Sequence, residues 1–471
     1  MIFEKIKPYI NKRNAIITLC LIILIGLIFL VPRFLKNNKT TLGIKSLSLA
    51  SKASKLLPIS DDEKKELEVM NTLVQKFTQK DDKERTFMIF LQNNMELRPG
   101  GGFLGQYAII KIKNGEVTSS FFEDANLLDQ RIHADVAPPY PFKRMMQIKK
   151  WKFRDSNFSP DFPTNVAKAK YFYKLAGRNA DNFDGFIAVN AQVFNDVLAL
   201  TGPVSVPGYS HEFNSTDGAL KLEEVVEKQY IMNPELDTQN RKMIMKKMTP
   251  IVIENLFSLG NVTKIAELVH NEFKNKNIMV NFTDPELESL ADSVYWTGKV
   301  AVDWGGDYLM ISDANMGSLK TDYYIKREIN YEVDFTGEKP VATLNINVKN
   351  TATYGDWRTS DYHEYMRVYV PKGSNFLDRK MVGYPNIGEE FKKTYFGVIL
   401  HSVMKTETDG MIKYELPDNI KAEDYRLLIQ KQSGAGDIPV HVTIKTKDGE
   451  FTQDQTLKDD LKFEFIKTSN Q

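Results

Sequence analysis

The chain has 471 residues, of which 42% are hydrophobic, 26% charged and 11% aromatic. These values are typical of a folded chain with two or three domains and exclude wholesale disorder or a many-span membrane protein. The 62 basic side chains nearly balance the 61 acidic ones, so no overall field would gather nucleic acid. The single cysteine, Cys20, lies in an apolar run, which excludes disulfide frameworks and Cys-based zinc sites elsewhere.

An uncharged segment near the N-terminus predicts a membrane anchor. Residues 15–31 carry no charge and span about 25 Å as a helix, which suffices to cross a bilayer when flanking basic side chains reach the headgroups. A cleaved signal peptide is the alternative, but the apolar run exceeds the usual signal core and no small-x-small site follows Pro32. We therefore expect one transmembrane helix after a short N-terminus at 1–14.

The orientation of this anchor follows from what comes after it. The basic residues on its two flanks are nearly balanced, so the charge rule alone does not decide. A large domain after an N-terminal anchor can be translocated despite nearby charge, and a cysteine-free domain suits an exported chain. We therefore expect a cell-membrane protein with a cytoplasmic N-terminus and an extracytoplasmic main part.

Residues 32–59 have no sustained hydrophobic period and are predicted to form a stalk. A helix is expected next, because Ser60 and Glu63 have the spacing of a capping box and apolar residues then recur every three or four positions. The strand candidate at 86–92 and a hairpin centred on Asn114-Gly115 begin a sheet. The irregular segment that follows, 123–163, is long enough to be functional or mobile.

Alternating helix and strand signals complete an α/β domain that we place at 60–280. A connector is expected at 281–307. From 308 to 471 the runs are nearly all strand-like and are separated by turn residues, as in a β-sandwich. The predicted fold is therefore α/β, a mixed sheet with flanking helices, plus a C-terminal all-β sandwich, preceded by one transmembrane helix.

A glycine-rich loop follows the first predicted strand. Gly100, Gly102 and Gly105 satisfy G-x-G-x-x-G, but a dinucleotide site needs a helix next, and the residues that follow alternate like a strand. Arg98 beside these glycines could grip an anion together with exposed backbone N–H groups. The alternative is a tight turn with a solvated arginine.

Two other polar clusters have similar alternatives. Arg154 and Asp155 lie in a turn-rich segment with Asp161, so the carboxylates could hold a cation, or Asx turns could simply clamp the loop. Arg241 lies on a predicted helix with several lysines, as part of an anion-binding face or of a solvated one. The zinc-hydrolase, serine-esterase and P-loop signatures do not occur in the sequence.

Four longer strings point to a family. LQNNMELRPGGGFLGQY, RDSNFSPDFP, DGFIAVNAQVFNDVLALTGPV and LLIQKQSG occur in this order. Together they resemble the bacterial envelope family known as domain of unknown function 4012 (DUF4012), whose members have no established reaction. The resemblance covers roughly residues 85–435.

The order of elements is also similar, more faintly, to the LytR-CpsA-Psr family, which transfers glycopolymers from polyprenyl-pyrophosphate lipids to the cell wall with Mg²⁺. This resemblance places Arg98, the Arg154-Asp155 pair and Arg241 where that family has functional residues. Asn93 and Asn94 stand where it carries a metal-binding aspartate. The implied motif set is therefore incomplete.

The sequence thus favours an envelope protein that binds or transfers a polyprenyl-pyrophosphate-linked glycopolymer, with a noncatalytic scaffold or glycan-binding protein as the alternative. As a phosphotransferase, its arginines would hold the pyrophosphate, and a carboxylate would hold Mg²⁺ or act as a base. Expected partners are the membrane and an anionic polyprenyl lipid or surface glycopolymer, not nucleic acid. The candidate catalytic residues are Arg98, Arg154, Asp155 and Arg241, and the candidate metal ligands are Asp155 and Asp161.

Overall fold

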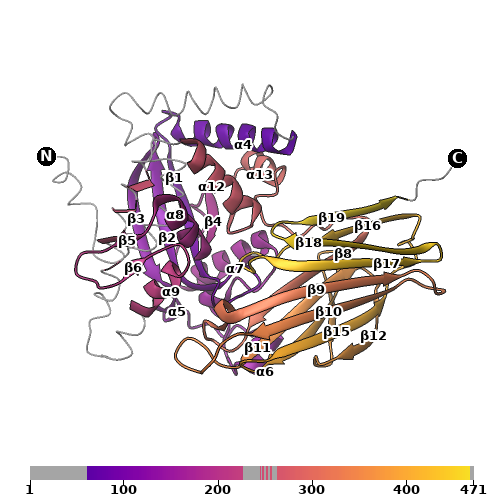
Figure 1. Ribbon diagram of the computed structural model, residues 1–471. Helices are drawn as coiled ribbons and strands as arrows, with labels where there is room; N and C mark the ends of the chain where they lie inside the picture. Colours follow the sequence, from indigo (N-terminus) through magenta and orange to yellow (C-terminus); the bar gives the residue numbers. More distant parts are fainter. Residues whose placement is uncertain are drawn as a thin grey trace.

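The computed structural model describes residues 61–225, 244, 247–248, 251–252, 255–256 and 262–466. Figure 1 shows two parts side by side, an α/β part coloured indigo to rose and a strand-built part coloured orange to yellow. The predicted transmembrane helix, the stalk and Arg241 lie outside the described residues. Among the described helices, none combines the length and the apolar character needed to span a membrane.

The α/β part is built on one mixed sheet of five strands. They are β1 (Glu84–Asn93), β2 (Phe103–Lys113), β3 (Glu116–Asp124), β4 (Gly185–Asn190) and β7 (Ile278–Phe282). Their order is β3-β2-β1-β4-β7, and β1 and β4 are parallel while the other neighbours are antiparallel. Asn114 and Gly115, which join β2 to β3, have φ of 53° and 76°, as a tight hairpin turn requires.

Helices cover both faces of this sheet. They are α4 (Asp61–Thr78), α5 (Ala125–Asp129), α7 (Phe162–Leu175), α8 (Gln192–Thr201), α9 (Gly218–Glu223), α12 (Val262–Lys274) and α13 (Pro285–Asp292), with a two-stranded ribbon of β5 (Val204–Ser205) and β6 (Glu212–Phe213). Helices α4, α8, α12 and α13 share a core with Phe87 and Ile89, whereas α5 and α7 pack with Met88 and Phe90. Successive strand residues point to opposite faces of the sheet. Both faces of β1 are buried because helices cover each of them.

The C-terminal part consists of two six-stranded sheets. The strands are β8 (Asp307–Asn315), β9 (Ile325–Asp334), β10 (Val341–Asn350), β11 (Tyr362–Pro371), β12 (Asn375–Lys380), β13 (Asn386–Glu390), β14 (Lys393–Ser402), β15 (Glu407–Glu415), β16 (Asp424–Ile429), β17 (Ile438–Thr446), β18 (Gly449–Leu457) and β19 (Leu461–Ile466), and a 3-10 turn, η5 (Thr321–Tyr324), precedes β9. Sheet I has the order β12-β15-β10-β9-β17-β18, and sheet II has the order β13-β14-β11-β8-β16-β19. One apolar core joins residues of both sheets, including Ile329 and Val398. The prediction of a mixed α/β region followed by a strand-rich C-terminal region is confirmed.

The irregular segment 123–163 connects the two parts. It contains α6 (Tyr140–Met145) and the 3-10 turn η3 (Phe153–Asp155). Phe142 and Phe158 share a buried cluster with Tyr365 of sheet II, and the Arg367 guanidinium donates a hydrogen bond to the Phe158 carbonyl. Much of this segment is therefore packed against the second sheet.

Residues 430–433, which follow β16, form a second connection. The side-chain amide of Gln432 donates to the carbonyls of Arg98 at 3.0 Å and Asp313 at 2.9 Å. The Lys431 ammonium donates to the Asn275 carbonyl at 3.0 Å. All four side chains of this short segment are buried. They attach the end of β16 to the loop between β1 and β2 and to the segment between α12 and β7.

Candidate functional site

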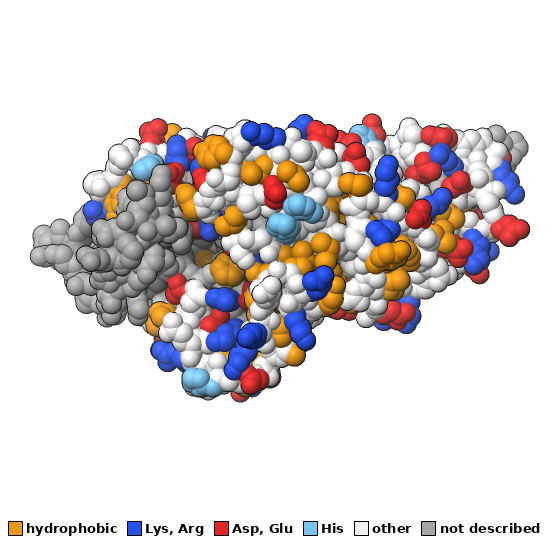
Figure 2. Space-filling model, turned by 90° about the horizontal axis from the view of Figure 1, so that it is seen from below, with side chains coloured by type: hydrophobic (Ala, Val, Ile, Leu, Met, Phe, Trp, Pro, Cys, Tyr) orange, Lys and Arg blue, Asp and Glu red, His pale blue; other side chains and the backbone are white. Residues whose placement is uncertain are grey.

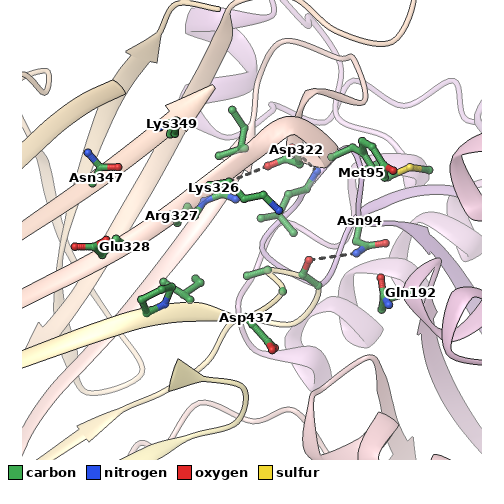
Figure 3. Close-up of a pocket in the computed structure, with 18 of the residues that line it drawn as sticks. Asn94, Met95, Gln192, Asp322, Lys326, Arg327, Glu328, Asn347, Lys349 and Asp437 are labelled. Carbon is green, nitrogen blue, oxygen red and sulfur yellow. Dashed lines mark hydrogen bonds and ion pairs between the residues drawn. The ribbon is translucent and has the colours of Figure 1, made fainter. Parts of the chain in front are cut away.

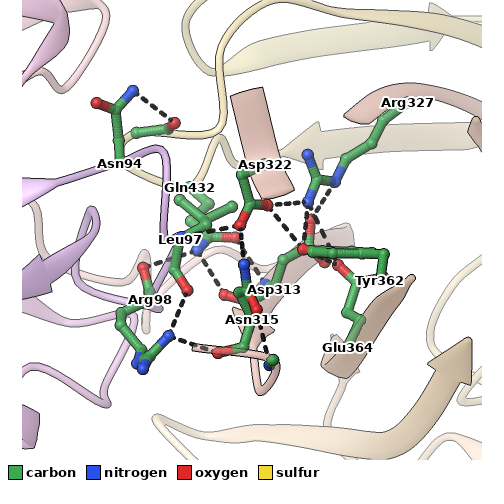
Figure 4. A network of polar contacts seen from close by, with 12 residues as sticks. Asn94, Leu97, Arg98, Asp313, Asn315, Asp322, Arg327, Tyr362, Glu364 and Gln432 are labelled. Atoms are coloured by element: carbon green, nitrogen blue, oxygen red, sulfur yellow. Dashed lines mark hydrogen bonds and ion pairs between the residues drawn. The ribbon is translucent and has the colours of Figure 1, made fainter. Parts of the chain in front are cut away.

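Arg98, a predicted anion ligand, is buried between the two parts of the molecule (Figure 4). Its guanidinium forms an ion pair with Glu96 at 2.8 Å and donates hydrogen bonds to the carbonyls of Leu97 and Asn315. The side chain is 1% exposed. Its described partners are thus internal, and its placement is that of a brace between β1 and β8.

The glycine loop beside Arg98 is packed and not open. Gly102 has φ of 141°, and a Cβ there would lie 2.5 Å from the Asn93 carbonyl carbon. At Gly101 a Cβ would approach the Ser433 hydroxyl to the same distance. Glycine is required because other residues would collide with the neighbouring chain at these positions. The strand that follows is β2, so the structural context of a dinucleotide fingerprint is missing in this described segment.

Arg154 and Asp155 lie beside each other in η3. The Arg154 side chain is 40% exposed, and its Nε lies 3.6 Å from a carboxylate oxygen of Asp155 and 3.6 Å from one of Asp129. Burial raises the pKa of Asp155, and the positive charges of Arg98 and Arg154 oppose that rise. Burial likewise raises the pKa of Asp129 to about 6, against the effect of Arg154. The arginine thus lies beside two buried carboxyl groups and opposes the rise in their pKa.

Asp161 caps helix α7. One of its oxygens accepts hydrogen bonds from the backbone N–H and the hydroxyl of Thr164, at 3.0 and 2.6 Å. The other accepts the backbone N–H of Val300 at 3.1 Å. The bonds from Thr164 complete the first turn of the helix. The bond from Val300 attaches the chain segment that leads to the C-terminal part to α7. These bonds also engage both carboxylate oxygens, which leaves the side chain little capacity to bind a cation.

The donor set does not fit the Mg²⁺ ion that the resemblance implies. Mg²⁺ prefers an octahedral shell of oxygen ligands, whereas the Asp161 oxygens are engaged and Asp155 faces a guanidinium. Within the described ranges, no group of three or more His, Cys, Asp and Glu side chains is arranged to hold a metal ion. We therefore derive no metal-dependent step.

A buried ionic network underlies the boundary between the two parts (Figure 4). Arg327 of β9 pairs with Asp313 and Asp322 at 2.8 Å each and with Glu364 at 3.4 Å. Burial and the neighbouring Asp313 raise the pKa of Glu364 well above its ordinary value, against the effect of Arg327. Asp322 also accepts the backbone N–H of Leu97 at 3.0 Å. The network thus fixes the start of β9 to the α/β part.

Above this network, a cavity of about 770 Å³ opens between the α/β part and sheet I. We call it the interdomain cleft (Figure 3). One wall contains Asn94 after β1 and the first residues of α8, and the other contains outward-facing residues of β9, β10 and β15. Residues 434–439 close one side. Its size is within the range of small-molecule sites.

The lining of the interdomain cleft is polar. Tyr323, with 36% of its surface exposed, is an aromatic side chain of this lining. Among the residues that the structure describes, three basic and five acidic side chains line the cleft, a formal balance of −2. The amide side chains are Asn94, Gln192, Asn195, Asn330 and Asn347, and the ionisable ones are Lys326, Arg327, Lys349, Asp322, Glu328, Glu407, Asp409 and Asp437.

Several amides of the cleft are held in place. Asn347 donates to Asp409 at 2.7 Å, and Gln192 donates to Asp196 at 3.0 Å. Asn94 donates to the Gly434 carbonyl at 3.4 Å. Each of these amides keeps its carbonyl oxygen as a further acceptor. Side chains fixed in this way are preorganised to bind hydroxyl groups.

The sequence analysis did not select this cleft. Its sheet wall comes from outward-facing residues such as Asn347 and Lys349 in β10, which alternate with buried ones. That alternation is the same for any sheet with one solvated face. The lining residues that lie within the strings that indicated a family are Asn94, Met95, Leu97, Ala191, Gln192, Asn195 and Gly434. None of the site residues predicted from the sequence is known to line the cleft. Arg98, Arg154, Asp155 and Asp161 do not line it, and Arg241 lies outside the described residues.

Comparison with known proteins confirms the family resemblance for part of the chain. Residues 82–230 match the family described as "Protein of unknown function (DUF4012)". No curated protein matches the chain.

Solved structures are similar over less than half of the chain. Protein Lin1025 from Listeria innocua is 13% identical with a TM-score of 0.26, over 45% of this chain and 80% of that one. Protein gbs0355 from Streptococcus agalactiae is 15% identical with a TM-score of 0.28, over 46% and 75%. At these scores neither structure supports an inference about this chain.

Proposed function

We propose that this protein is a noncatalytic glycan-binding protein of the bacterial cell envelope, and that its interdomain cleft holds an uncharged glycan. The observation that carries the proposal is the polar lining of the 770 Å³ cavity, with fixed amides, carboxylates and one partly exposed tyrosine. Amides can donate to and accept from sugar hydroxyls, and ionised carboxylates can accept hydrogen bonds from them. The tyrosine ring offers a flat apolar face to a sugar ring.

The charge of the cleft favours an uncharged ligand over a phosphorylated one. A pyrophosphate group is best held by forked arginine donors or backbone N–H groups. In the cleft, the guanidinium of Arg327 is already committed to the buried network, and Lys349 is paired with Glu407. The formal balance of −2 would repel a polyanion.

Transfer from a polyprenyl-pyrophosphate lipid is the alternative function. Of the arginines assigned to it, Arg98 is 1% exposed, whereas Arg154 is 40% exposed. A lipid-linked substrate would therefore have to approach Arg154, or Arg241 outside the described residues. The proposed membrane anchor and extracytoplasmic position rest on the apolar run at 15–31 and the absence of later cysteines.

The test is calorimetric titration of the full-length protein in lipid nanodiscs with two probes, cellohexaose and hexa-N-acetylchitohexaose. Loss of the Tyr323 ring should remove stacking and buried apolar area worth about 1–2 kcal/mol, so Tyr323→Ala should weaken binding roughly five- to thirtyfold. The matched control is Tyr171→Ala, because Tyr171 is 44% exposed and does not line the cleft.

Three outcomes decide between the functions. Binding that Tyr323→Ala weakens and Tyr171→Ala does not supports the cleft. Equal affinity in both variants, or no binding of either glycan, contradicts it. Tighter binding of a short-chain polyprenyl pyrophosphate than of either glycan would favour the transfer alternative.

A further inference from the structure

A row of polar side chains crosses the outer face of sheet I and leaves the interdomain cleft. Asp409 of β15 lies opposite Asn347 of β10, which lies opposite Glu328 of β9. His441 of β17 lies 3.6 Å from Glu328 and 2.8 Å from Asp454 of β18. We call these five side chains the polar row. Its first three members line the cleft, and its last two lie beyond it.

The members of the polar row are accessible and linked. Glu328, His441 and Asp454 have side chains that are 46%, 40% and 74% exposed. Asn347 donates a hydrogen bond to Asp409, and Asn330 donates one to Glu328 at 3.4 Å. Each strand supplies one member, and the row crosses the strands with a two-residue step between β9 and β17, where His441 lies opposite Asn330.

The spacing of the row matches an extended polysaccharide. Neighbouring strands lie ~4.8 Å apart, so five strands place the ends of the row about 19 Å apart. A sugar ring in an extended β-linked chain is comparable in length to this strand spacing. Successive rings can therefore meet one polar side chain each without loss of register over this length.

The chemistry of the row also selects the ligand. Carboxylates, an amide and an imidazole can each bond to one or two hydroxyls. Three of the five members are carboxylates, which disfavours a phosphorylated or uronic polymer. The imidazole of His441 is held between Glu328 and Asp454.

Resting on the proposed function, we propose that an uncharged β-linked glycan lies across sheet I along the polar row, one sugar ring per strand, from the cleft to β18. The cleft then binds one end of the polymer, and the His441–Asp454 end binds rings that have left it. Affinity should rise with chain length until the row is filled, at about five rings.

The experiment measures the affinity of full-length protein for cello-oligosaccharides and N-acetylchito-oligosaccharides of two to six rings. In the wild type, each ring added between three and five should tighten binding about threefold or more, a typical gain for one or two net hydrogen bonds. The double variant His441→Ala, Asp454→Ala should lose this gain, with five-ring affinity about tenfold lower and two-ring affinity unchanged.

Two further variants separate binding from folding. His441→Gln keeps a hydrogen-bonding side chain and should recover most of the five-ring affinity. Lys445→Ala is the matched control, because Lys445 pairs with Glu332 on the same strands but outside the row. It should leave the length dependence unchanged. Unfolding curves that coincide with the wild type exclude a folding defect in either variant.

The outcomes distinguish the two proposals. Affinity that stops rising at two or three rings in the wild type overturns the polar row and leaves glycan binding in the cleft standing. A double variant that keeps the full length dependence would also overturn the polar row and leave glycan binding in the cleft standing. Absence of binding by both series overturns the proposed function and, with it, the row.

Discussion

Replacing Arg98 tests whether this side chain is a brace or a ligand-binding group. In Arg98→Ala, the Glu96 carboxylate loses its ion-pair partner, and the carbonyls of Leu97 and Asn315 lose a donor. Glu96 is 6% exposed. Removing one partner of a buried ion pair typically costs about 3–5 kcal/mol, because the remaining charge is left without compensation.

Protonation of Glu96 limits that cost. Burial raises the pKa of this carboxyl already, and the charge of Arg98 is the main effect that opposes the rise. Without Arg98, the pKa of Glu96 should rise further, so that protonation more readily replaces the buried charge by a neutral group. We therefore expect a loss of about 3 kcal/mol in the free energy of unfolding, at the lower end of the range.

The assay is urea unfolding of the full-length protein, followed by tryptophan fluorescence. The double variant Glu96→Leu, Arg98→Leu is the matched control. Because an apolar pair of similar volume can replace a buried ion pair at little cost, it should recover most of the lost stability. A fall of less than about 1 kcal/mol in Arg98→Ala, together with weaker binding of a pyrophosphate lipid, would refute the brace and restore the ligand assignment.

Two further predictions concern buried carboxyl groups. Burial and the neighbouring Asp196 raise the pKa of Glu272 to about 9. Between pH 4.5 and 9, the folded state therefore holds a proton that the unfolded state has released. The free energy of unfolding should fall as the pH rises through this window. Glu272→Gln should flatten that dependence in denaturation curves, and an unchanged slope would contradict the assignment. Asp161→Ala removes a helix cap and the bond to Val300 and should cost about 1–3 kcal/mol in the same measurement; a loss below the error of the method would show that this cap is not needed.

Local parts of the fold were predictable because their signals lie close together in the sequence. The capping spacing of Ser60 and Glu63 predicts a helix, and α4 begins at Asp61. The Asn114-Gly115 hairpin was predicted from its turn chemistry, and the two strands pair from Lys113 and Glu116 onward. In these cases a few adjacent residues determine the backbone.

The site was not predictable in the same way. One partner of the Arg98 guanidinium is the Asn315 carbonyl, 217 positions further along the chain, and a basic side chain beside glycines gives no indication of such a contact. The wall of the interdomain cleft has the pattern of an ordinary solvated sheet face. Its significance depends on what lies opposite, which only the packing of the two parts decides.

The hydrogen bond from Gln432 to the Arg98 carbonyl has a consequence for the order in which the chain folds. The two residues are 334 positions apart. At a synthesis rate of about 5–20 residues per second, roughly 20–70 s separate the appearance of these residues. During that time, the loop after β1 is complete but lacks the segment that covers it. In a newly made chain, the polar groups that Gln432 covers in the folded protein therefore stay open to solvent until the last hundred residues are being delivered.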